Sequence, residues 1–372
     1  MMQKEIKIKR REFIHSSASA LGLLLAPVAR AGTTAASGRR LLAIDGLSIA
    51  FRVMDDEPVG PDVLAAIRAS GLSAINMTTP YPGDDFRTAV DKISRLQHII
   101  AGHAEDLELI RSTADIERCH QNGKLGIIIG FQSTEMFDES LSAISTFYGL
   151  GARIIQMTYN GPGLFGQGCL SEDQTGLTEV GRNAVAELNG RHLLIDLSHA
   201  NKSTTAEAIA SSTDPVAISH SGCNTIYRHP RSNDDAELRA MAEKGGVVGI
   251  YLMPFLDGGS GELTAGMLFR HLEYALNICG EDHVGIGSDQ GVRAVEDGPE
   301  YRARLKTEVE RRKAAGISAP GESADRPPFV PSLNRSDRLH EIAGLMESRG
   351  HSGRVIEKVT GANFLRLMKE VW

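Results

Sequence analysis

The sequence predicts an α/β fold, specifically a TIM-type (β/α)8 barrel with closing helices at its C-terminus. Short apolar runs alternate with helix-length segments along most of the chain. There are enough of these runs to form the eight strands of a barrel, and several end on a polar side chain that is able to do chemistry. Active sites of such barrels lie at the carboxyl ends of the strands, so these polar residues are the candidates for function.

The element boundaries follow from apolar runs, helical periodicity and glycine stops. Residues 84–101 place Val90, Ile93, Leu96 and Ile99 at the spacing of one helix face. The runs that predict strands are residues 41–44, 74–78, 125–131, 152–157, 193–197, 215–219, 247–251 and 283–287. The segments that predict the main helices are 63–70, 84–101, 141–150, 178–189, 204–211, 234–244 and 264–279. Further helices are predicted at 106–110, 114–122, 337–346 and 352–371.

The first 31 residues are typical of an export signal and do not belong to the fold. A basic start that includes Arg10 and Arg11 precedes a modestly apolar run, residues 14–28, and a small-x-small cleavage pattern ends at Ala31. This order predicts a twin-arginine signal, with the twin-arginine export machinery as a partner and a periplasmic or otherwise exported mature protein. Residues 32–40 predict a flexible leader, and 41–372 a single domain.

The composition excludes some classes of protein. A net charge of −7, an aromatic content of 5% and the lack of a basic patch in the mature chain argue against nucleic-acid binding. Residues 292–332, rich in charged residues and proline, predict an inserted exposed segment. The four cysteines leave two alternatives, disulfides or buried free thiols, because an exported protein permits either.

A pair of histidines is the strongest candidate for a functional site. His199 and His220 each follow an apolar run, residues 193–197 and 215–219, with one helix-length segment between the runs. Neighbouring parallel strands would bring both imidazoles to the same end of the sheet, where neutral imidazole is a favoured ligand of zinc. Asp289 ends the eighth run and is expected at the same end.

Several short motifs, in this order, resemble those of the membrane (renal) dipeptidase family, which is peptidase family M19 of the amidohydrolase-type metal-dependent hydrolases. They are Gly176-Leu177-Thr178-Glu179-Val180-Gly181-Arg182, Asp196-Leu197-Ser198-His199, Ser219-His220-Ser221, His229-Pro230-Arg231, Gly245-Gly246-Val247-Val248-Gly249, Val284-Gly285-Ile286-Gly287-Ser288-Asp289 and Gly361-Ala362-Asn363-Phe364. The resemblance extends from about residue 41 to residue 372. It implies a TIM-barrel hydrolase with a two-zinc site.

The resemblance also implies roles for individual residues. His199 and His220 match the two histidines that hold the second zinc, and Asp289 matches the eighth-strand aspartate. Arg231 matches the arginine that binds the carboxylate of the substrate. Asp289 is a candidate metal ligand, and equally a candidate general base that later donates a proton to the leaving amine.

This sequence departs from the family pattern at the first zinc. Leu47 and Ile49 replace the histidine and aspartate of the first strand, and Gln132 replaces the glutamate that bridges the two ions. Tyr159 replaces the strand-four histidine beside the substrate, where it could bind the substrate and donate a hydrogen bond to the developing oxyanion. A neutral amide bridges two cations poorly, so the sequence predicts one zinc per chain.

The sequence therefore predicts an exported, metal-dependent hydrolase that cleaves the amide bond of a dipeptide or related small carboxylate-bearing amide. The candidate metal ligands are His199, His220, Gln132 and Asp289. The alternative is a catalytically altered barrel that acts as a small-molecule binding protein or a non-hydrolytic tailoring enzyme. A homodimer is left open.

Overall fold

The structure is a computed structural model that describes residues 40–50, 59–259 and 261–372. The predicted export signal, residues 1–31, lies outside the described residues, as does the predicted leader except for Arg40.

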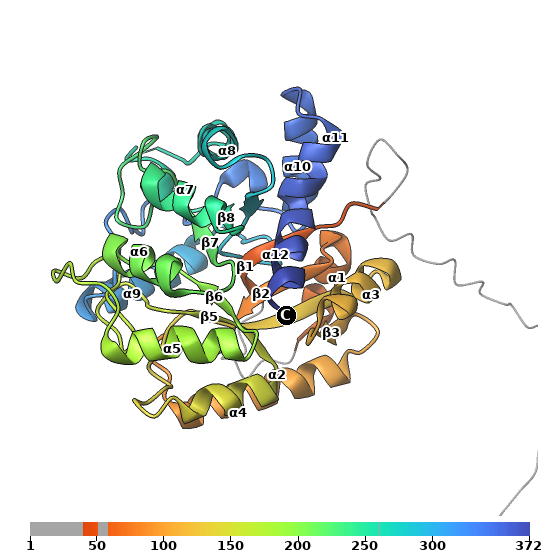
Figure 1. Cartoon of the computed structure of the whole chain (residues 1–372). Coiled ribbons are helices and arrows are strands. Elements are labelled where there is room, and N and C mark those ends of the chain that lie inside the picture. The colour runs from red at the N-terminus through yellow and green to blue at the C-terminus, as the bar shows by residue number, and fades with distance from the viewer. Residues whose placement is uncertain (1–39, 51–58, 260) are drawn as a thin grey trace, which may run out of the picture.

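Ten strands form one parallel sheet that curls into a barrel (Figure 1). The strands are β1 Ile44–Ala50, β2 Ala74–Thr78, β3 Leu107–Leu109, β4 Leu125–Phe131, β5 Ala152–Gln156, β6 Leu194–Asp196, β7 Ala217–Ser221, β8 Val247–Ile250, β9 Val284–Ile286 and β10 Gln290–Gly291. Their order is β10-β1-β2-β4-β5-β6-β7-β8-β9, and β3 pairs with β4 outside this path. Because β10 directly follows β9 and pairs with β1, the sheet closes on itself, which confirms the predicted (β/α)8 barrel.

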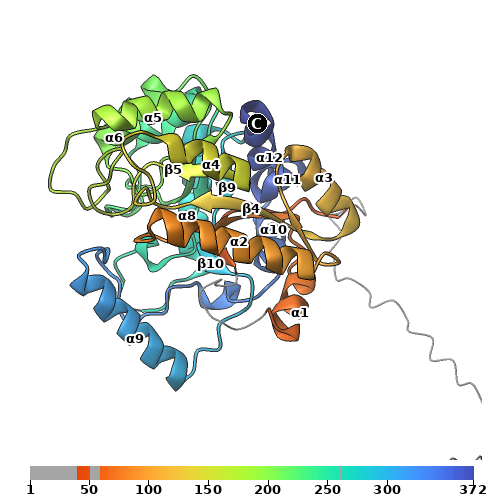
Figure 2. The ribbon, with the colours of Figure 1, turned by 90° about the horizontal axis from the view of Figure 1, so that it is seen from below.

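Helices connect the strands and cover the outside of the barrel, and the last helices pack along one side (Figures 1 and 2). The α-helices are α1 Pro61–Ser70, α2 Phe86–Gly102, α3 Thr113–Asn122, α4 Ser142–Leu150, α5 Glu179–Gly190, α6 Lys202–Ser211, α7 Asp235–Glu243, α8 Ala265–Cys279, α9 Pro299–Ala314, α10 Arg338–Ser348, α11 Gly353–Glu357 and α12 Asn363–Val371. Shorter helical turns are η1 Pro254–Leu256, η2 Pro331–Leu333 and η3 Lys358–Ala362.

Two of the predicted elements are wrong. Residues 106–110, predicted as a helical piece, contain strand β3, because pairing with β4 supplies hydrogen bonds that local sequence does not reveal. The first strand was placed at residues 41–44, whereas β1 runs from Ile44 to Ala50 between β2 and β10. Asp45 and Leu47 therefore lie within the strand and not beyond its end.

Helix α12 closes the barrel at the end opposite the predicted site. Its residues Phe364, Leu367 and Met368 are buried against a layer made by one residue from each of seven strands, which are Ile44, Ala74, Ile128, Ile154, Leu194, Ala217 and Val247. The Phe364 ring is packed tightly: a Cβ atom built on Gly46 or Gly285 would lie 2.3 or 2.5 Å from it. One end of the barrel is thus filled with apolar side chains, which leaves the other end for chemistry.

The inserted segment, residues 292–332, which the sequence predicts to be exposed, is exposed along α9 and buried in part beyond it. Helix α9 stands apart from the ring of barrel helices (Figure 2), and most of its side chains are exposed. The chain that follows returns to the barrel, where Ala319, Phe329 and Val330 are buried. Buried apolar contacts of these few residues hold the segment against the barrel, and composition alone does not show them.

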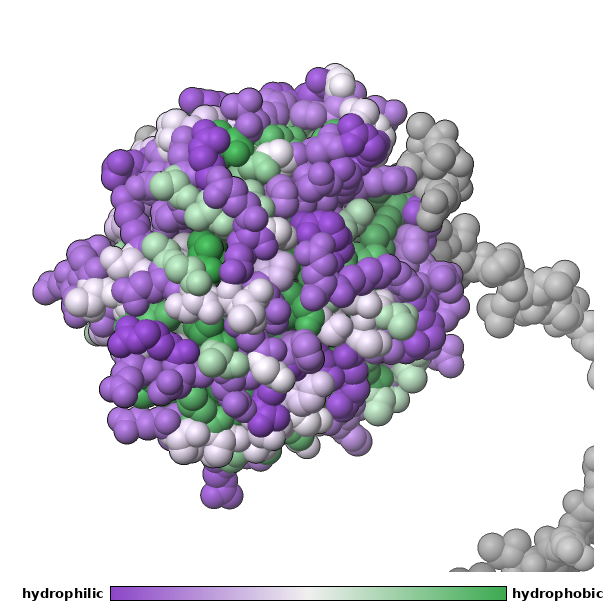
Figure 3. All heavy atoms as spheres, viewed as in Figure 1, coloured by the Kyte–Doolittle hydropathy of each residue, from purple (hydrophilic) through white to green (hydrophobic). Residues whose placement is uncertain are grey.

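The surface is largely hydrophilic on the face that Figure 3 shows. Among the described residues, the only large hydrophobic side chains called exposed are Phe86 and Tyr148. No described helix combines the length and the apolar character needed to span a bilayer. All four cysteines are free, and three of them are buried, so the free-thiol alternative is confirmed for this structure.

Candidate functional site

The fold brings the sequence-predicted residues to the carboxyl ends of neighbouring strands. His220 lies in β7, His199 comes three residues after the end of β6, and Asp289 comes three residues after the end of β9. His199 and Asp289 also have positive φ angles, 66° and 55°, a conformation that costs free energy in residues other than glycine. Such strain concentrates at functional sites, where surrounding structure maintains it.

Asn160 determines which nitrogen of His199 carries the proton. Its amide nitrogen donates to the carbonyl oxygen of Ile317 (2.7 Å), which turns its Oδ1 atom toward His199 Nδ1 (2.6 Å). An amide oxygen only accepts, so Nδ1 of His199 is the donor. The Nε2 atom of the neutral ring therefore carries a free lone pair.

A buried aspartate does the same for His220 through a serine. Ser219 Oγ donates to Asp196, and it lies 2.9 Å from His220 Nδ1, from whose N–H group it accepts a hydrogen bond. Asp196 is fixed as an acceptor because the backbone N–H groups of Ser198 and Ser219 also donate to its Oδ1 atom. Asp196 therefore orients His220 through Ser219.

The two imidazoles consequently direct lone pairs at each other. The Nε2 atoms are 2.9 Å apart, and both rings are buried, with exposed fractions of 6% for His199 and 0% for His220. Burial, reinforced by Arg231, lowers the pKa of each histidine well below its ordinary value, so neither ring supplies a proton to the other. Two zinc-bound nitrogens in a tetrahedral site would lie roughly 3.3 Å apart, so a small opening of the pair accommodates one ion.

The other side chains around the two histidines suit one metal ion better than two. Gln132 Nε2 lies 3.3 Å from His220 Nε2, while its oxygen accepts from the Thr78 hydroxyl (3.0 Å). Gln132 could ligate only after a half-turn of its amide, which the Thr78 hydroxyl tolerates because it can also accept. Leu47 is buried and offers no ligand. No group of three His, Cys, Asp or Glu side chains within the described ranges is arranged to hold a metal.

Asp289 is held by the first strand. Its backbone N–H donates to the carbonyl oxygen of Leu47 (2.9 Å), and the preceding residue, Ser288, donates from its backbone and its hydroxyl to Asp45. Burial raises the pKa of Asp289 to about 7, although Arg231 and Arg312 oppose this shift. Both forms of its carboxyl group are therefore accessible near neutral pH, as proton transfer requires. Asp45, within β1, thus holds the residue that precedes Asp289.

Arg231 is a buried cation that lacks a carboxylate partner. It is 4% exposed, it donates from Nη2 to the carbonyl oxygen of His220 (3.3 Å), and it lies 5.9 Å from the centre of the Tyr251 ring. In the part of the chain that the structure describes, no ion pair of Arg231 occurs. A buried guanidinium without an anion is costly, so this position suits the binding of an anionic ligand.

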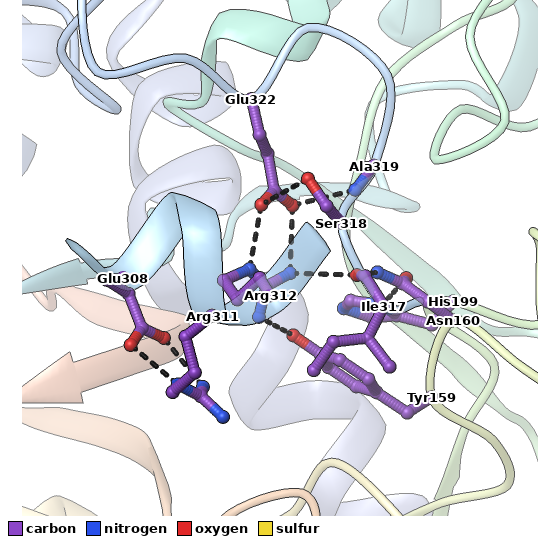
Figure 4. A network of polar contacts seen from close by, with 10 residues as sticks. All are labelled: Tyr159, Asn160, His199, Glu308, Arg311, Arg312, Ile317, Ser318, Ala319 and Glu322. Carbon is purple, nitrogen blue, oxygen red and sulfur yellow. Dashed lines mark hydrogen bonds and ion pairs between the residues drawn. The ribbon is translucent and has the colours of Figure 1, made fainter. Parts of the chain in front are cut away.

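Tyr159 lies against His199 and connects it to the inserted segment (Figure 4). The two rings stack, with centres 4.5 Å apart and planes at 23°, and the Tyr159 hydroxyl accepts from Arg312 Nη1 (3.1 Å). Burial raises the pKa of Tyr159, whereas the charges of Arg312 and Arg231 lower it and that of Asp289 raises it further.

Sequence reasoning missed Asn160 and Arg312 as site residues. Asn160 directly follows Tyr159 at the end of a predicted strand, a position that could have identified it. Arg312 is separated from Tyr159 by 153 residues and lies in a charged segment, so no local signal distinguishes it from its neighbours. The structure also shows that the Pro320 carbonyl contacts His229 Nε2 (2.8 Å), which places this segment over the strand ends.

A (β/α)8 barrel with two imidazoles, a carboxyl group and a free guanidinium at the carboxyl ends of its strands has the layout of a metal-dependent hydrolase. A model of the family described as membrane dipeptidase (peptidase family M19) matches residues 65–315. The chain therefore belongs to the membrane dipeptidase family, and it is a hydrolase of that family.

Individual relatives agree with this assignment. A protein of Klebsiella pneumoniae, described as an uncharacterized protein in the pqqA 5' region, is 29% identical over 301 residues, which cover 78% of this chain and 98% of that one. Dipeptidase tcpJ of Claviceps purpurea is 25% identical over 288 residues, covering 77% of this chain and 60% of the fungal protein. The chain thus spans less than two thirds of this fungal relative.

Solved structures share the fold. A crystal structure of an amidohydrolase from Pseudomonas aeruginosa superposes with a TM-score of 0.78 and 31% identity, covering 89% of this chain and 97% of that one. A metallopeptidase from Rhodobacter sphaeroides, liganded with a phosphinate mimic of the dipeptide L-Ala-D-Ala, has a TM-score of 0.71 over 89% of this chain and 99% of its own. Its 19% identity supports likeness of fold alone.

Proposed function

We propose that this chain hydrolyses the amide bond of a dipeptide, or of a related small amide with a free carboxylate, with one zinc ion held by His199 and His220. The observation that carries the proposal is the convergence of two unprotonated Nε2 atoms 2.9 Å apart, each oriented by a hydrogen bond from the other ring nitrogen. Gln132 and Asp289 remain candidates for a further ligand. When bound, zinc would polarise the amide carbonyl and lower the pKa of water.

Three side chains bind the substrate, stabilise the developing charge and transfer the proton. Arg231 binds the substrate carboxylate with its guanidinium, which orients the scissile amide over the histidine pair. Tyr159 donates a hydrogen bond from its hydroxyl to the oxygen on which negative charge develops. Asp289 accepts a proton from the attacking water at a carboxylate oxygen and then releases it to the nitrogen of the leaving amine.

One relative supports a small peptide as the substrate class, since the fungal relative is named a dipeptidase. Hydrolysis by this chain is also favoured over the alternative of a binding protein, because a protein that only binds a ligand needs no carboxyl group poised for proton transfer. Asp289, with its pKa raised to about 7, keeps such a group at the carboxyl end of the barrel.

Removal of His220 is expected to abolish zinc binding. Purified wild-type protein should contain about one zinc ion per chain, and His220→Ala close to none, because a single imidazole cannot hold the ion against a competing chelator. Metal content is measured by elemental analysis after dialysis. His98→Ala is the matched control, because His98 is exposed on α2, far from β7 in sequence, and should leave the zinc content unchanged.

Zinc-loaded wild-type protein is then assayed against a panel of dipeptides. Cleavage of at least some members supports the proposal. Binding without cleavage would establish the alternative, and absence of zinc from the wild-type protein would refute the metal site. Two zinc ions per chain would refute the single-zinc site and show that a first zinc binds despite Leu47 and Ile49.

We also propose that the hydrolase acts outside the cytoplasm, after export of the folded chain through the twin-arginine route. The support is the sequence around Arg10 and Arg11 and the cleavage pattern that ends at Ala31. The double substitution Arg10→Lys, Arg11→Lys is expected to retain the precursor in the cytoplasm, as followed by cell fractionation and immunoblotting. Unchanged export of this variant would contradict the route.

A further inference from the structure

The inserted segment brings a second arginine to the site, and this arginine is fixed in one orientation. Arg312 forms a two-pronged ion pair with Glu322, from Nε to Oε2 (2.7 Å) and from Nη2 to Oε1 (2.8 Å). Glu322 in turn accepts from the Ala319 backbone (2.9 Å) and from the Ser318 hydroxyl (3.1 Å), as Figure 4 shows. The side chains of Arg312 and Glu322 are only 18% and 11% exposed. A planar guanidinium held in this way has little freedom.

The Nη1 atom of Arg312 determines the direction in which the Tyr159 hydroxyl donates. Arg312 Nη1 lies 3.1 Å from the phenol oxygen, and a guanidinium has donors but no acceptor. The phenol oxygen therefore accepts at this contact, and its own proton must point elsewhere. No described residue accepts a hydrogen bond from the Tyr159 hydroxyl. The ring of Tyr159 stacks on His199. The free O–H is thus available to a ligand above the histidine pair.

The same segment also holds the other side of His199. The Ile317 carbonyl oxygen accepts from Arg312 Nη2 (3.2 Å) and from the Asn160 amide (2.7 Å), and that amide fixes His199 Nδ1. Arg312 therefore contacts both the phenol and the carbonyl that orients Asn160. One buried guanidinium connects the inserted segment to the two side chains that pack on and bond to His199.

We propose that Arg312 is a positioning residue for Tyr159: it fixes the phenol oxygen as an acceptor, so that the phenol proton is directed to the substrate oxygen above the histidine pair. The proposal rests on the hydrolysis proposed above, since it assigns the donor that stabilises charge in that reaction. Loss of one such preorganised donor lowers kcat by about 10²-fold in other hydrolases.

The test combines turnover with a signal that needs neither zinc nor substrate. Arg312→Met, Tyr159→Phe and the double variant are compared with the wild-type protein. Each single substitution should lower kcat by about 10²-fold with little change in KM, and the double variant should fall no further, because both remove the same interaction. Arg311→Met is the matched control, since the neighbouring Arg311 pairs with Glu308 at the surface and should retain full turnover.

The second readout is ¹⁹F NMR of metal-free protein labelled with 3-fluorotyrosine. The sequence has seven tyrosines, so the Tyr159 resonance is assigned by its loss in Tyr159→Phe. We expect this resonance to shift or broaden in Arg312→Met and to remain in place in Arg311→Met. An unchanged resonance, unchanged kcat or fully additive losses in the double variant would overturn the proposal.

Arg312→Lys keeps the test decisive if Arg312→Met fails to fold. Lysine can donate to the phenol but cannot form the fork with Glu322, so kcat should fall below the wild-type value and the Tyr159 resonance should shift. Wild-type kcat together with an unshifted resonance in Arg312→Lys would refute a positioning role. If the wild-type protein cleaves no dipeptide, hydrolysis fails as a function, whereas the NMR comparison still decides whether Arg312 positions Tyr159.

Discussion

Asp289→Asn is expected to lower kcat by about 10² to 10⁴-fold while the zinc content stays near that of the wild-type protein. The substitution keeps the shape of the side chain and removes the group that takes a proton from water and returns it to the amine. The backbone that carries Asp289 is held independently by the Leu47 carbonyl and by the bonds of Ser288 to Asp45, so the site should keep its geometry.

Steady-state kinetics and elemental analysis together separate the two candidate roles of Asp289. If Asp289→Asn loses zinc in proportion to activity, the carboxylate is a ligand and not primarily a proton carrier. Asp282→Asn is the matched control, because Asp282 precedes β9 at the opposite end of the same strand and forms a surface ion pair with Lys358. It should show wild-type turnover, and equal loss in both variants would indicate general damage to the strand.

Because of His271, the free energy of unfolding is expected to be about 3 kcal/mol smaller at low pH than at neutral pH. It lies on α8, is fully buried, accepts the Cys223 backbone N–H at Nδ1 (2.9 Å), and contacts the Leu256 carbonyl through Nε2 (2.8 Å). Burial lowers the pKa of His271 to about 4. A proton added at Nδ1 would remove the acceptor of the Cys223 N–H group.

The free energy of unfolding falls at low pH because the unfolded chain takes up a proton there. Unfolded His271 has a pKa near 6.5, so between about pH 6.5 and 4 the unfolded chain binds a proton that the folded chain does not. The stabilising contribution of neutral His271 is thus complete above pH 6.5 and is lost as the pH falls toward 4. The loss concerns the free energy of unfolding and requires no change in the functional site.

Urea unfolding of metal-free protein at pH 7.5 and pH 4.5 measures this effect. His271→Gln should lose about 2 to 3 kcal/mol less than the wild-type protein over this interval, since glutamine can donate to Leu256 and does not titrate. Equal pH dependence of His271→Gln and wild type would contradict the depressed pKa.

The sequence by itself determined the barrel and the location of its chemical end. Apolar runs bounded by polar residues predicted seven of the eight strands of the barrel in their places, because a buried parallel strand needs apolar side chains on both faces. The sequence did not predict β1 and β3 correctly, because each depends on pairing with other strands. Strand β1 pairs with β2 and β10, and β3 pairs with β4. The pattern of chemistry at strand ends also predicted that His199, His220 and Asp289 share one end of the barrel.

Only the tertiary structure decided how these residues work together. The protonation of His199 follows from Asn160, and the direction of the Tyr159 hydroxyl follows from Arg312. These hydrogen bonds join segments far apart in the sequence, and their energies depend on angstrom-scale geometry and burial. A one-dimensional pattern shows that a histidine follows a strand, but the lone pairs converge because the closed barrel and the returning segment over it fix both rings.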